Sequence, residues 1–504
     1  MRKSILRASA AMQTIALLGV GATAFIAAAP AAAQDYTSGA LVGSVHSAAG
    51  APVAGATVTL RSIAQGQVRN LVTGASGTFN AAGLTPGDYT INIAAGGYNT
   101  HAGTISIVAS QTNSVDVGLE TAASGNAIVV TGSRLRQSVT QGTTGANINV
   151  VKVNEQLPIG HDITDITLLA PTTLRGVSGF ATAAGDSVPS VGGGSVAENA
   201  YYVNGLNITN PDTYVGGSRV PFYLYQNVDV QTGGYPAEFG RATGGVINAT
   251  TKSGSNIPFV ALHLDWEPNF LRSHSPNRGN PDSPTDIGRL RSIENRSATL
   301  EAGGAVVPDH LFVYGLLQAN RNTDKAAYPN AGQYEIQKDN DPFYAFKIDG
   351  YITPTQHAEF TYFDTRSKIN IFDYDFEAND AYTDGTIGTK GLAAVQEAGG
   401  VNWIARYTGN ITDWLTASAA YGLSKDKGSN QPADNTSYYV IDRRTVTTGG
   451  NAKAVGQPFA TQDILNTRRR FYRGDMDARF TFGGTHHVRF GFDHEDLSEN
   501  KIAT

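Results

Sequence analysis

A glycine-rich stretch at residues 233–256, GGYPAEFGRATGGVINATTKSGSN, holds the residues most suggestive of chemistry. A phosphate-binding loop needs the spacing G-x-x-x-x-G-K-[S/T] between a strand and a helix. Here Lys252 follows the strand-like run that contains Val246 and Ile247, and no helical pattern comes after it. A flexible linker would lack that run. We therefore expect the glycines to let the backbone turn tightly and approach neighbouring strands, without a nucleotide site.

Acidic and histidine side chains gather at two further places. Residues 371–385 contain five carboxylates: Asp373, Asp375, Glu377, Asp380 and Asp384. They lack the spacing of an EF-hand and its glycine at the sixth position, so a solvated acidic loop is the simpler interpretation. His486 and His487 stand beside a turn, where such a pair usually faces an interface. We predict no catalytic residue, no metal site and no cofactor.

The composition favours a β-rich protein with an apolar exterior. The 504 residues suggest several domains, and only 16% are charged, against roughly 25% in soluble domains. Glycine is abundant, and Tyr and Phe far outnumber Trp. With no cysteine, disulfides and thiolate metal sites are excluded. The net charge of −6 argues against nucleic acid as a partner, because phosphate binding needs a basic surface.

Residues 1–33 have the pattern of a secretory signal peptide. Arg2, Lys3 and Arg7 precede the apolar segment TIALLGVGATAFIAAAP at 14–30. Small residues then lead to a cleavage site between Ala33 and Gln34. A retained membrane anchor is the alternative. No later stretch approaches the roughly 20 apolar residues of a spanning helix, so we expect any further contact with a membrane to be made by β structure.

Residues 36–120 read as short strands separated by glycine turns, without a helical pattern. Strands spaced by about ten residues predict a small β-sandwich. The motifs GAPVAGATV at 50–58 and LTPGDY at 84–89 resemble the carboxypeptidase regulatory-like domain over nearly the whole segment. Neither H-x-x-E nor H-E-x-x-H occurs there, so we expect a binding or spacer module and not an enzyme.

Residues 125–256 mix short strands with helical segments and predict a small α+β domain. The helix-like segment 163–172 has Asp162 or Thr164 as a candidate cap. The segments YYVNGLNITNP at 201–211 and VDVQTGGYPAEFGRATGGVINATTKSG at 228–254 resemble the plug domain of TonB-dependent outer-membrane receptors, in particular their Oar-like branch. Asn204 stands where that family usually carries Asp.

The resemblance implies structural roles for four plug residues, which are Glu238, Arg241, Gly244 and Gly245. Glu238 and Arg241 would form an ion pair that holds the plug, either internally or against a barrel wall. A solvated surface pair, contributing about 0–1 kcal/mol, is the alternative that the sequence leaves open.

Residues 257–504 alternate between apolar and charged positions along extended segments. In the segment 470–482, Tyr472, Met476 and Phe480 fall on one face, and Arg473 and Asp477 on the other. A strand between lipid and a polar lumen needs this pattern. Short turns near 306–310, 353–356, 410–413 and 483–485 alternate with long polar segments near 267–296, 322–342, 367–400 and 426–468. This plan is typical of an outer-membrane β-barrel.

The sequence supplies about nine such strands, whereas closed bacterial barrels have an even number and large plugged transporters have around 22. We therefore expect a fragment or a truncated gene product. The predicted fold is mainly β: signal peptide (1–33), sandwich (36–120), plug (125–256) and the N-terminal part of a transmembrane barrel (257–504).

A short β-branched segment, AIVVTG at 127–132, follows a small-residue linker. It resembles the TonB box and could pair with a partner by strand addition, or it could be the first plug strand. The candidate contact residues are Ile128, Val129, Val130, Thr131 and Gly132.

The resemblance implies an outer-membrane receptor that takes up an unidentified extracellular ligand. Its expected partners are the TonB energy-transducing complex and outer-membrane lipid. An Oar-like surface adhesin or secretion-associated barrel without import is the alternative.

Overall fold

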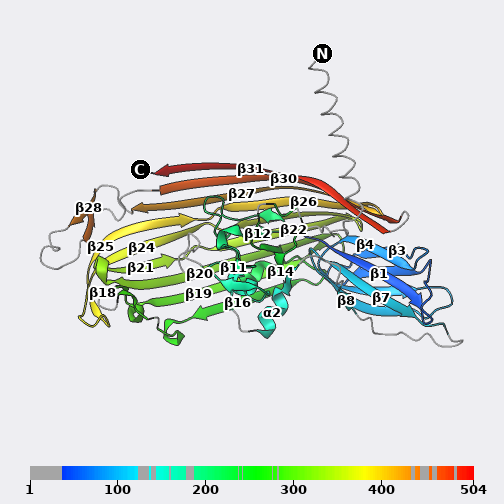
Figure 1. The fold of residues 1–504 in the computed structure, drawn as a ribbon, viewed down its shortest axis with the longest axis horizontal. Coiled ribbons are helices and arrows are strands. Elements are labelled where there is room, and N and C mark those ends of the chain that lie inside the picture. The colour runs from blue at the N-terminus through cyan, green and yellow to red at the C-terminus, as the bar shows by residue number, and fades with distance from the viewer. Residues whose placement is uncertain are drawn as a thin grey trace, which may run out of the picture.

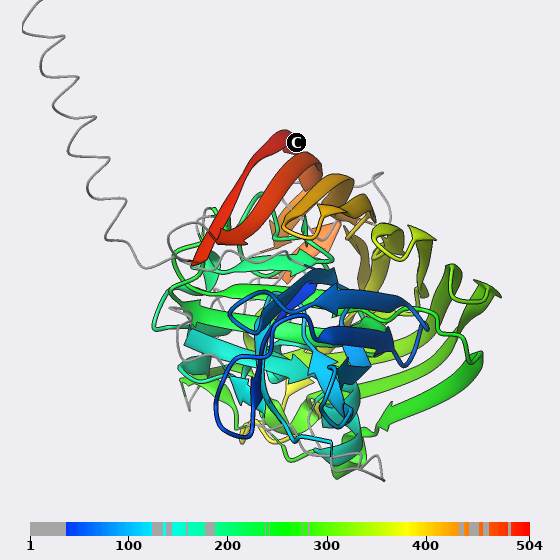
Figure 2. The ribbon, with the colours of Figure 1, turned by 90° about the vertical axis from the view of Figure 1, so that its right-hand side faces the viewer.

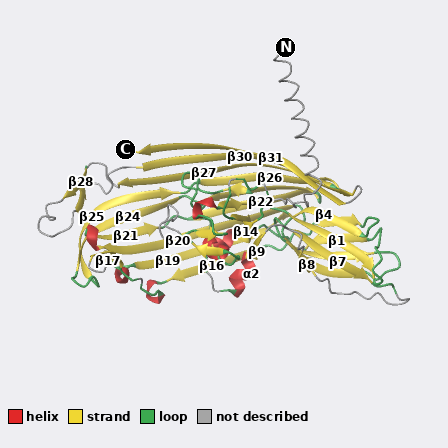
Figure 3. Cartoon of the chain, viewed as in Figure 1, coloured by secondary structure: helices red, strands yellow, loops and turns green. Residues whose placement is uncertain are grey.

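The computed structural model describes residues 37–122, 135–137, 144–157, 160–176, 187–236, 238–240, 242–274, 276–280, 283–432, 438–442, 453–456, 463–481 and 485–503. Strands dominate these residues (Figure 3). The predicted signal peptide with Ala33 and Gln34, and the predicted TonB box at 128–132, lie outside them. The chain forms a sandwich at one end of a large curved sheet and an inner domain against that sheet (Figure 1).

The N-terminal domain is a sandwich of two sheets, ordered β4-β1-β7-β8 and β3-β2-β5-β6. Its strands are β1 (Gly39–Ser47), β2 (Thr57–Ser62), β3 (Val68–Val72), β4 (Thr78–Leu84), β5 (Gly87–Ala94), β6 (His101–Ile107), β7 (Thr112–Leu119) and β8 (Leu135–Gln137). All seven strands expected between residues 36 and 120 are present. Leu60, Ile91 and Ile93 are fully buried between the sheets, as their alternation along β2 and β5 predicts.

The inner domain, residues 144–256, is built on a five-stranded sheet ordered β13-β12-β15-β14-β9. Its strands are β9 (Thr144–Asn149), β12 (Ala200–Val203), β13 (Leu206–Asn207), β14 (Tyr225–Gly233) and β15 (Val246–Thr251). The short antiparallel pair β10 (Thr173–Arg175) and β11 (Pro189–Val191) comes between β9 and β12 in the sequence. This is the α+β arrangement that the sequence predicts.

Two short helices, α2 (Val150–Gln156) and α3 (Ile163–Thr167), belong to the inner domain. The Asp162 side chain caps α3 by accepting a hydrogen bond from the Asp165 amide at 2.7 Å, so Asp162 rather than Thr164 is the cap. No helix in the described part of the chain is long and apolar enough to cross a membrane.

Nine strands form one continuous antiparallel sheet, which we call the wall. Its neighbours are paired in the order β16-β19-β20-β22-β23-β26-β27-β30-β31. The strands are β16 (Phe259–Glu267), β19 (Ser292–Val307), β20 (Leu311–Tyr328), β22 (Phe343–Thr353), β23 (Gln356–Asp364), β26 (Val401–Thr412), β27 (Leu415–Pro432), β30 (Asp463–Thr481) and β31 (Thr485–Ala503). The predicted short turns at 306–310, 353–356 and 410–413 join neighbouring wall strands at the end that faces the sandwich (Figure 1).

The segments expected as long polar loops at 322–342 and 367–400 are largely strands, so the loop prediction was wrong there. They contain the end of β20 and the strands β21 (Gln333–Asp339), β24 (Ser367–Ala378) and β25 (Gly385–Ala398). These strands pair with one another and with the far ends of β20 and β27. Backbone pairing extends the wall there even though the side chains lack a clean apolar alternation. Smaller hairpins occur at β17 (Arg278–Asn280) with β18 (Ser283–Asp286) and at β28 (Tyr439–Asp442) with β29 (Lys453–Gly456).

The two faces of the wall differ in chemistry. Along β22, Phe346 and Ile348 are 41% and 38% exposed on the outer face, whereas Lys347 and Asp349 are 7% and 1% exposed on the inner face. At these positions the apolar side chains point away from the inner domain and the charged ones point toward it, while Phe343 and Ala345 near the start of β22 are buried in a core with the inner domain. The predicted alternation is present, and its apolar face points outward.

Candidate functional site

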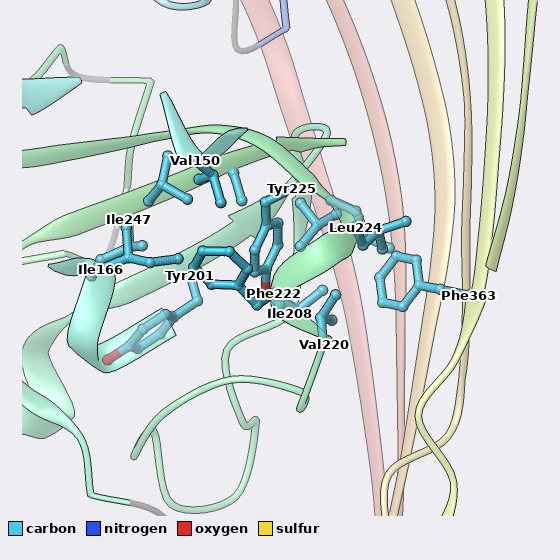
Figure 4. Close-up of a cluster of buried hydrophobic side chains, with 14 of the residues drawn as sticks. Val150, Ile166, Tyr201, Ile208, Val220, Phe222, Leu224, Tyr225, Ile247 and Phe363 are labelled. Carbon is cyan, nitrogen blue, oxygen red and sulfur yellow. The ribbon is translucent and has the colours of Figure 1, made fainter. Parts of the chain in front are cut away.

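The inner domain and the wall share one hydrophobic core. Tyr225 and Leu224 belong to the inner domain, and Phe363 reaches them from β23 (Figure 4). Tyr314 and Phe471 join the same core from β20 and β30. Tyr223 and Tyr225 therefore pack in the core of the inner domain. Polar contacts surround this apolar core, and they also orient the inner domain against the wall.

The turn between β12 and β13 is the most tightly held part of this interface. Asn204 and Gly205 adopt φ values of 49° and 79°, which Asn and Gly tolerate best. The Asn204 side-chain amide donates to the hydroxyl of Thr251 at 2.8 Å and to that of Thr361 on the wall at 2.9 Å. Its carbonyl oxygen accepts from the Thr251 amide at 3.0 Å. An Asp at this position has no N–H to give either hydroxyl.

Two arginines of the wall bind backbone carbonyls of this turn region. Arg406 on β26 donates to the Asn204 carbonyl at 3.2 Å. Arg469 on β30 donates to the carbonyls of Asn207 and Thr209 at 2.8 and 3.1 Å. Both arginines are about 4% exposed or less. Their fixed guanidinium geometry suits two neighbouring carbonyls better than a lysine would.

The carboxylate of Glu238 also meets the wall. It accepts a charge-assisted hydrogen bond from Arg473 on β30, and its Oε2 lies 3.1 Å from Arg489 on β31. Arg473 is held in turn by Asp475 at 2.6 Å. Arg241, the partner proposed from the sequence, lies outside the described residues, so a pair between Glu238 and Arg241 stays a prediction.

Burial and the arginines act on Glu238 in opposite directions. Burial is the larger influence and raises the pKa of the Glu238 carboxyl, while the positive charges of Arg489 and Arg473 lower it. A carboxyl in this position depends on its arginines to stay ionised. Wall arginines therefore compensate a largely buried charge of the inner domain.

The glycines at 244 and 245 lie where side chains would collide with the inner domain. A Cβ at Gly245 would come within 2.4 Å of the Val191 side chain, and one at Gly244 within 2.8 Å of the Asn199 side-chain oxygen. The Asn199 oxygen accepts a hydrogen bond from the Gly245 amide at 2.9 Å. These contacts give a physical reason for glycine at both positions.

Lys252 anchors the C-terminal end of the inner domain. Its ammonium lies 2.9 Å from both oxygens of Glu301 on β19. Tyr314 donates to the same carboxylate at 2.7 Å, and His263 lies 2.9 Å from it. The lysine that sequence analysis tested as a phosphate ligand therefore pairs with a wall carboxylate.

Sequence analysis did not single out the wall arginines. The alternation along β26, β30 and β31 placed Arg406, Arg469, Arg473 and Arg489 on a polar face, which was the available signal. It did not reveal that the inner domain fills the space they point into, because that requires knowing which strands face it.

No group of three or more His, Cys, Asp or Glu within the described ranges is arranged to hold a metal ion. His487 binds Asp477 on the neighbouring strand at 2.7 Å, and His486 stacks on Phe480. The histidine pair therefore serves contacts between strands. Among the acidic loop residues, Asp375 accepts from Thr389 at 2.9 Å.

Comparison with known proteins agrees with this architecture. Residues 40–120 match the carboxypeptidase regulatory-like domain. Among curated proteins, the chain matches a TonB-dependent transporter. That relative is Oar of Myxococcus xanthus, 29% identical over 273 residues, which are 52% of this chain and 25% of Oar. The match thus spans a quarter of the curated relative.

Solved structures of outer-membrane transporters are also similar. The transporter YddB of Escherichia coli is 13% identical, with a TM-score of 0.48 over 71% of this chain and 54% of YddB. The siderophore receptor PirA of Acinetobacter baumannii is 14% identical, with a TM-score of 0.46 over 71% of this chain and 48% of PirA.

The match to Oar confirms the resemblance to TonB-dependent receptors that the sequence indicated. The chain is a homologue of the TonB-dependent transporter Oar and carries a carboxypeptidase regulatory-like domain. Its curated relative is a transporter and not an enzyme, which agrees with the expectation drawn from the missing catalytic motifs.

Proposed function

We propose that this chain works as a TonB-dependent outer-membrane receptor. In this proposal the wall lies in the outer membrane, the inner domain is the plug, and an extracellular ligand enters past the plug when a TonB-type partner pulls on the chain. The relationship to Oar supports the class of protein. The ligand is not identified by the residues described above, because fold does not fix cargo.

The observation that carries the proposal is the orientation of the two faces of the wall. Its outer face is apolar, and its inner face is charged and filled by the inner domain. On β30, Tyr472 and Phe480 are both 42% exposed on the outer face. They are eight residues apart, about 27 Å along a strand and roughly 21 Å along the membrane normal at a typical tilt. An apolar band about 25 Å tall has this height.

Aromatic rings form a ladder across the outer face. Phe346, Phe360, Trp403, Tyr421 and Tyr472 lie on five successive wall strands, and neighbouring ring centroids are 4.9–6.2 Å apart. Large apolar rings on the outer face add to the lipid-facing apolar band that outer-membrane barrels need. The ladder supports a location in the outer membrane.

A plugged receptor needs an energy source, since its interior is filled with polar contacts that must be broken. The segment Ile128–Gly132 suits strand addition to a periplasmic partner. We expect Val129→Pro to weaken binding of a purified TonB periplasmic domain at least tenfold, because proline removes the backbone N–H used in pairing.

Val129→Ala is the matched control, since it shortens the side chain but keeps the N–H. We expect its TonB affinity to stay within about twofold of the parent, as backbone pairing supplies most of the contact. Equal binding by the parent and Val129→Pro would show that TonB does not use this segment. In that case the receptor would need a different coupling segment.

A further inference from the structure

The sandwich is docked on the wall through its β2–β3 turn. Gln65 donates to the Gly254 carbonyl at 3.2 Å, and Gln67 donates to the carbonyl of Asp309 in the β19–β20 turn. The Asn256 amide donates to the Ala64 carbonyl at 2.8 Å. Both glutamines are buried. The turn therefore sits between the end of the inner domain and the first short turn of the wall.

Other parts of the sandwich reach more distant wall strands. Tyr351 at the end of β22 donates to the Gln65 side-chain oxygen at 2.7 Å and lies 2.9 Å from the Thr85 hydroxyl. Arg479 on β30 donates to the Asn80 side-chain oxygen at 3.2 Å. The β19–β20 turn and β30 are five strand steps apart along the wall, about 24 Å at the usual strand spacing. The sandwich thus bridges a large part of the arc.

The sandwich also touches the inner domain directly. Asn248 on β15 donates to the Ser110 hydroxyl at 3.0 Å, and both residues are buried. Gln111 hydrogen-bonds the buried carboxyl of Asp229 on β14. Viewed from the sandwich end, the blue strands lie in front of the inner domain instead of beside the wall (Figure 2).

A cavity of about 750 Å³, partly open to solvent, lies between the three parts. Gln65 and Gln111 line it from the sandwich, Thr250 and Ser253 from the inner domain, and Lys347 from the wall. Any solute that passed the inner domain on this side would enter the cavity and meet the sandwich. The docking contacts are mainly single hydrogen bonds between uncharged groups, which are individually weak and can be exchanged for water.

We propose that the carboxypeptidase regulatory-like sandwich is a second closure, in series with the inner domain, that must undock from the wall before a solute can leave. This inference rests on the proposed receptor function for the direction of transport. A passive spacer would not need contacts on the inner domain and on widely separated wall strands at once.

Thiol labelling tests the closure, because the chain has no cysteine and any introduced one is unique. Ser253→Cys places a reporter in the cavity with little change in shape. In the full chain we expect slow modification of this thiol by a large polyethylene-glycol maleimide and fast modification by N-ethylmaleimide.

Adding Gln65→Ala and Gln67→Ala should speed labelling by the large reagent at least about tenfold, because the variant loses the three hydrogen bonds that these side chains make with Gly254, Tyr351 and Asp309. Asn70→Ala is the matched control, because it removes an exposed amide of the same domain away from the wall. Equal rates of labelling with and without the two glutamines would overturn the proposal.

A reversible lock provides a second variant that does not depend on weakening the interface. A Cβ at Gly83 would lie 3.4 Å from Cγ2 of Thr408 on β26, so Gly83→Cys with Thr408→Cys places two thiols within disulfide reach. We expect oxidation of this pair to slow labelling at position 253 by the large reagent, and reduction to restore it.

The oxidised and reduced forms are the same polypeptide, so strain at residue 83, where φ is 66°, affects both. Labelling is read at position 253 by mass spectrometry. Equal rates in the two forms would show that access does not require undocking and would refute the closure. Neither labelling experiment needs TonB or a ligand, so the proposed receptor function and the closure can fail separately.

Discussion

Strands of the sandwich and of the wall show the same alternation of apolar and polar residues. Their exposed or buried apolar faces differ, because this face points inward in the sandwich and outward in the wall. In the sandwich, the apolar positions of β2 and β5 point into a dry core, where Leu60 and Ile91 are fully buried. In the wall, the apolar positions point outward, and Leu262 and Leu264 are 63% and 73% exposed. A period of two fixes that a strand has two faces. What covers each face is decided by the neighbouring parts of the chain and by the surrounding solvent.

The difference is clearest where charges are buried. The sandwich core contains hydrophobic side chains, whereas the inner face of the wall buries Lys347, Asp349 and Glu359 together. Burying a charge is unfavourable unless it is paired. The wall meets this need with ion pairs among its own strands, while the sandwich core is apolar.

The largest effect is expected from removing a wall arginine. Arg473→Ala would leave Glu238 buried without its closest charge partner, which typically costs about 3–5 kcal/mol. We expect the inner domain to become sensitive to proteolysis in the purified full chain. Arg272→Ala, which removes an exposed pair with Glu267 at the end of β16 of the same wall, should cost less than about 1 kcal/mol.

Adding Glu238→Gln to Arg473→Ala should recover part of the loss, since the unpaired charge is then absent. If Arg473→Ala, like the control variant, unfolds at the same denaturant concentration as the parent, the wall charges do not hold the inner domain.

A leucine should matter inside the sandwich and far less on the wall. Leu60→Ala would open a cavity in a fully buried core and lower the unfolding free energy of the sandwich by about 2–5 kcal/mol. Leu317→Ala removes the same atoms from a side chain that is 49% exposed on β20. We expect its free energy of unfolding in detergent to change by no more than about 1 kcal/mol. Thermal unfolding of both variants measures the two effects. Equal losses would mean that the outer face of the wall is packed in a core.

A charge on the outer face distinguishes lipid from water. Phe346 on the wall and Val72 on the sandwich are both exposed, at 41% and 67%. We expect Phe346→Arg to reduce assembly into membranes by about 2–4 kcal/mol, as arginine does near a bilayer midplane. Val72→Arg should change stability by about 0.5 kcal/mol or less, because it faces water. Similar behaviour of the two variants would remove the basis for a membrane location.

The last effect depends on pH and concerns Asp229, where the inner domain meets the sandwich. Burial raises the pKa of its carboxyl to about 6. A carboxyl with a raised folded pKa adds stability below its unfolded pKa, and that stability is lost as the pH rises through about 6. Asp229→Asn should therefore gain up to roughly 3 kcal/mol relative to the parent between pH 4 and 7.

Asn70→Ala, which removes an exposed amide of the sandwich, is the control. Urea unfolding of the inner domain in this variant should follow the parent at every pH. A parent and an Asp229→Asn variant with parallel pH profiles would show that the carboxyl does not titrate in this window.

Much of the fold was readable from the sequence because the relevant signals are local. Alternation along β5 and β30, the cap at Asp162 and the short turns between wall strands each depend on neighbouring residues. The hairpins β20–β21 and β24–β25 were read as loops because apolar and polar side chains are mixed on both faces of β24, and strand pairing there depends on backbone partners that are distant in sequence.

The site was less accessible to sequence analysis. Glu238 was recognised as a residue that could hold the inner domain, but its contacts with Arg473 and Arg489 join positions more than 230 residues apart. Asn204 stood out only as a departure from a family pattern. Its role in binding Thr361 across the interface became visible once the turn was placed against β23.

By itself, the sequence determined most of the strands, which of their faces are apolar, and that three chemically different regions follow one another. Tertiary structure alone decided that the polar segments at 322–342 and 367–400 form strands, that the second region packs against the inner face of the third, and that the first region contacts both. The reason is physical: alternation is a property of neighbouring residues, whereas the choice between lipid, water and protein depends on which parts of the chain meet in space.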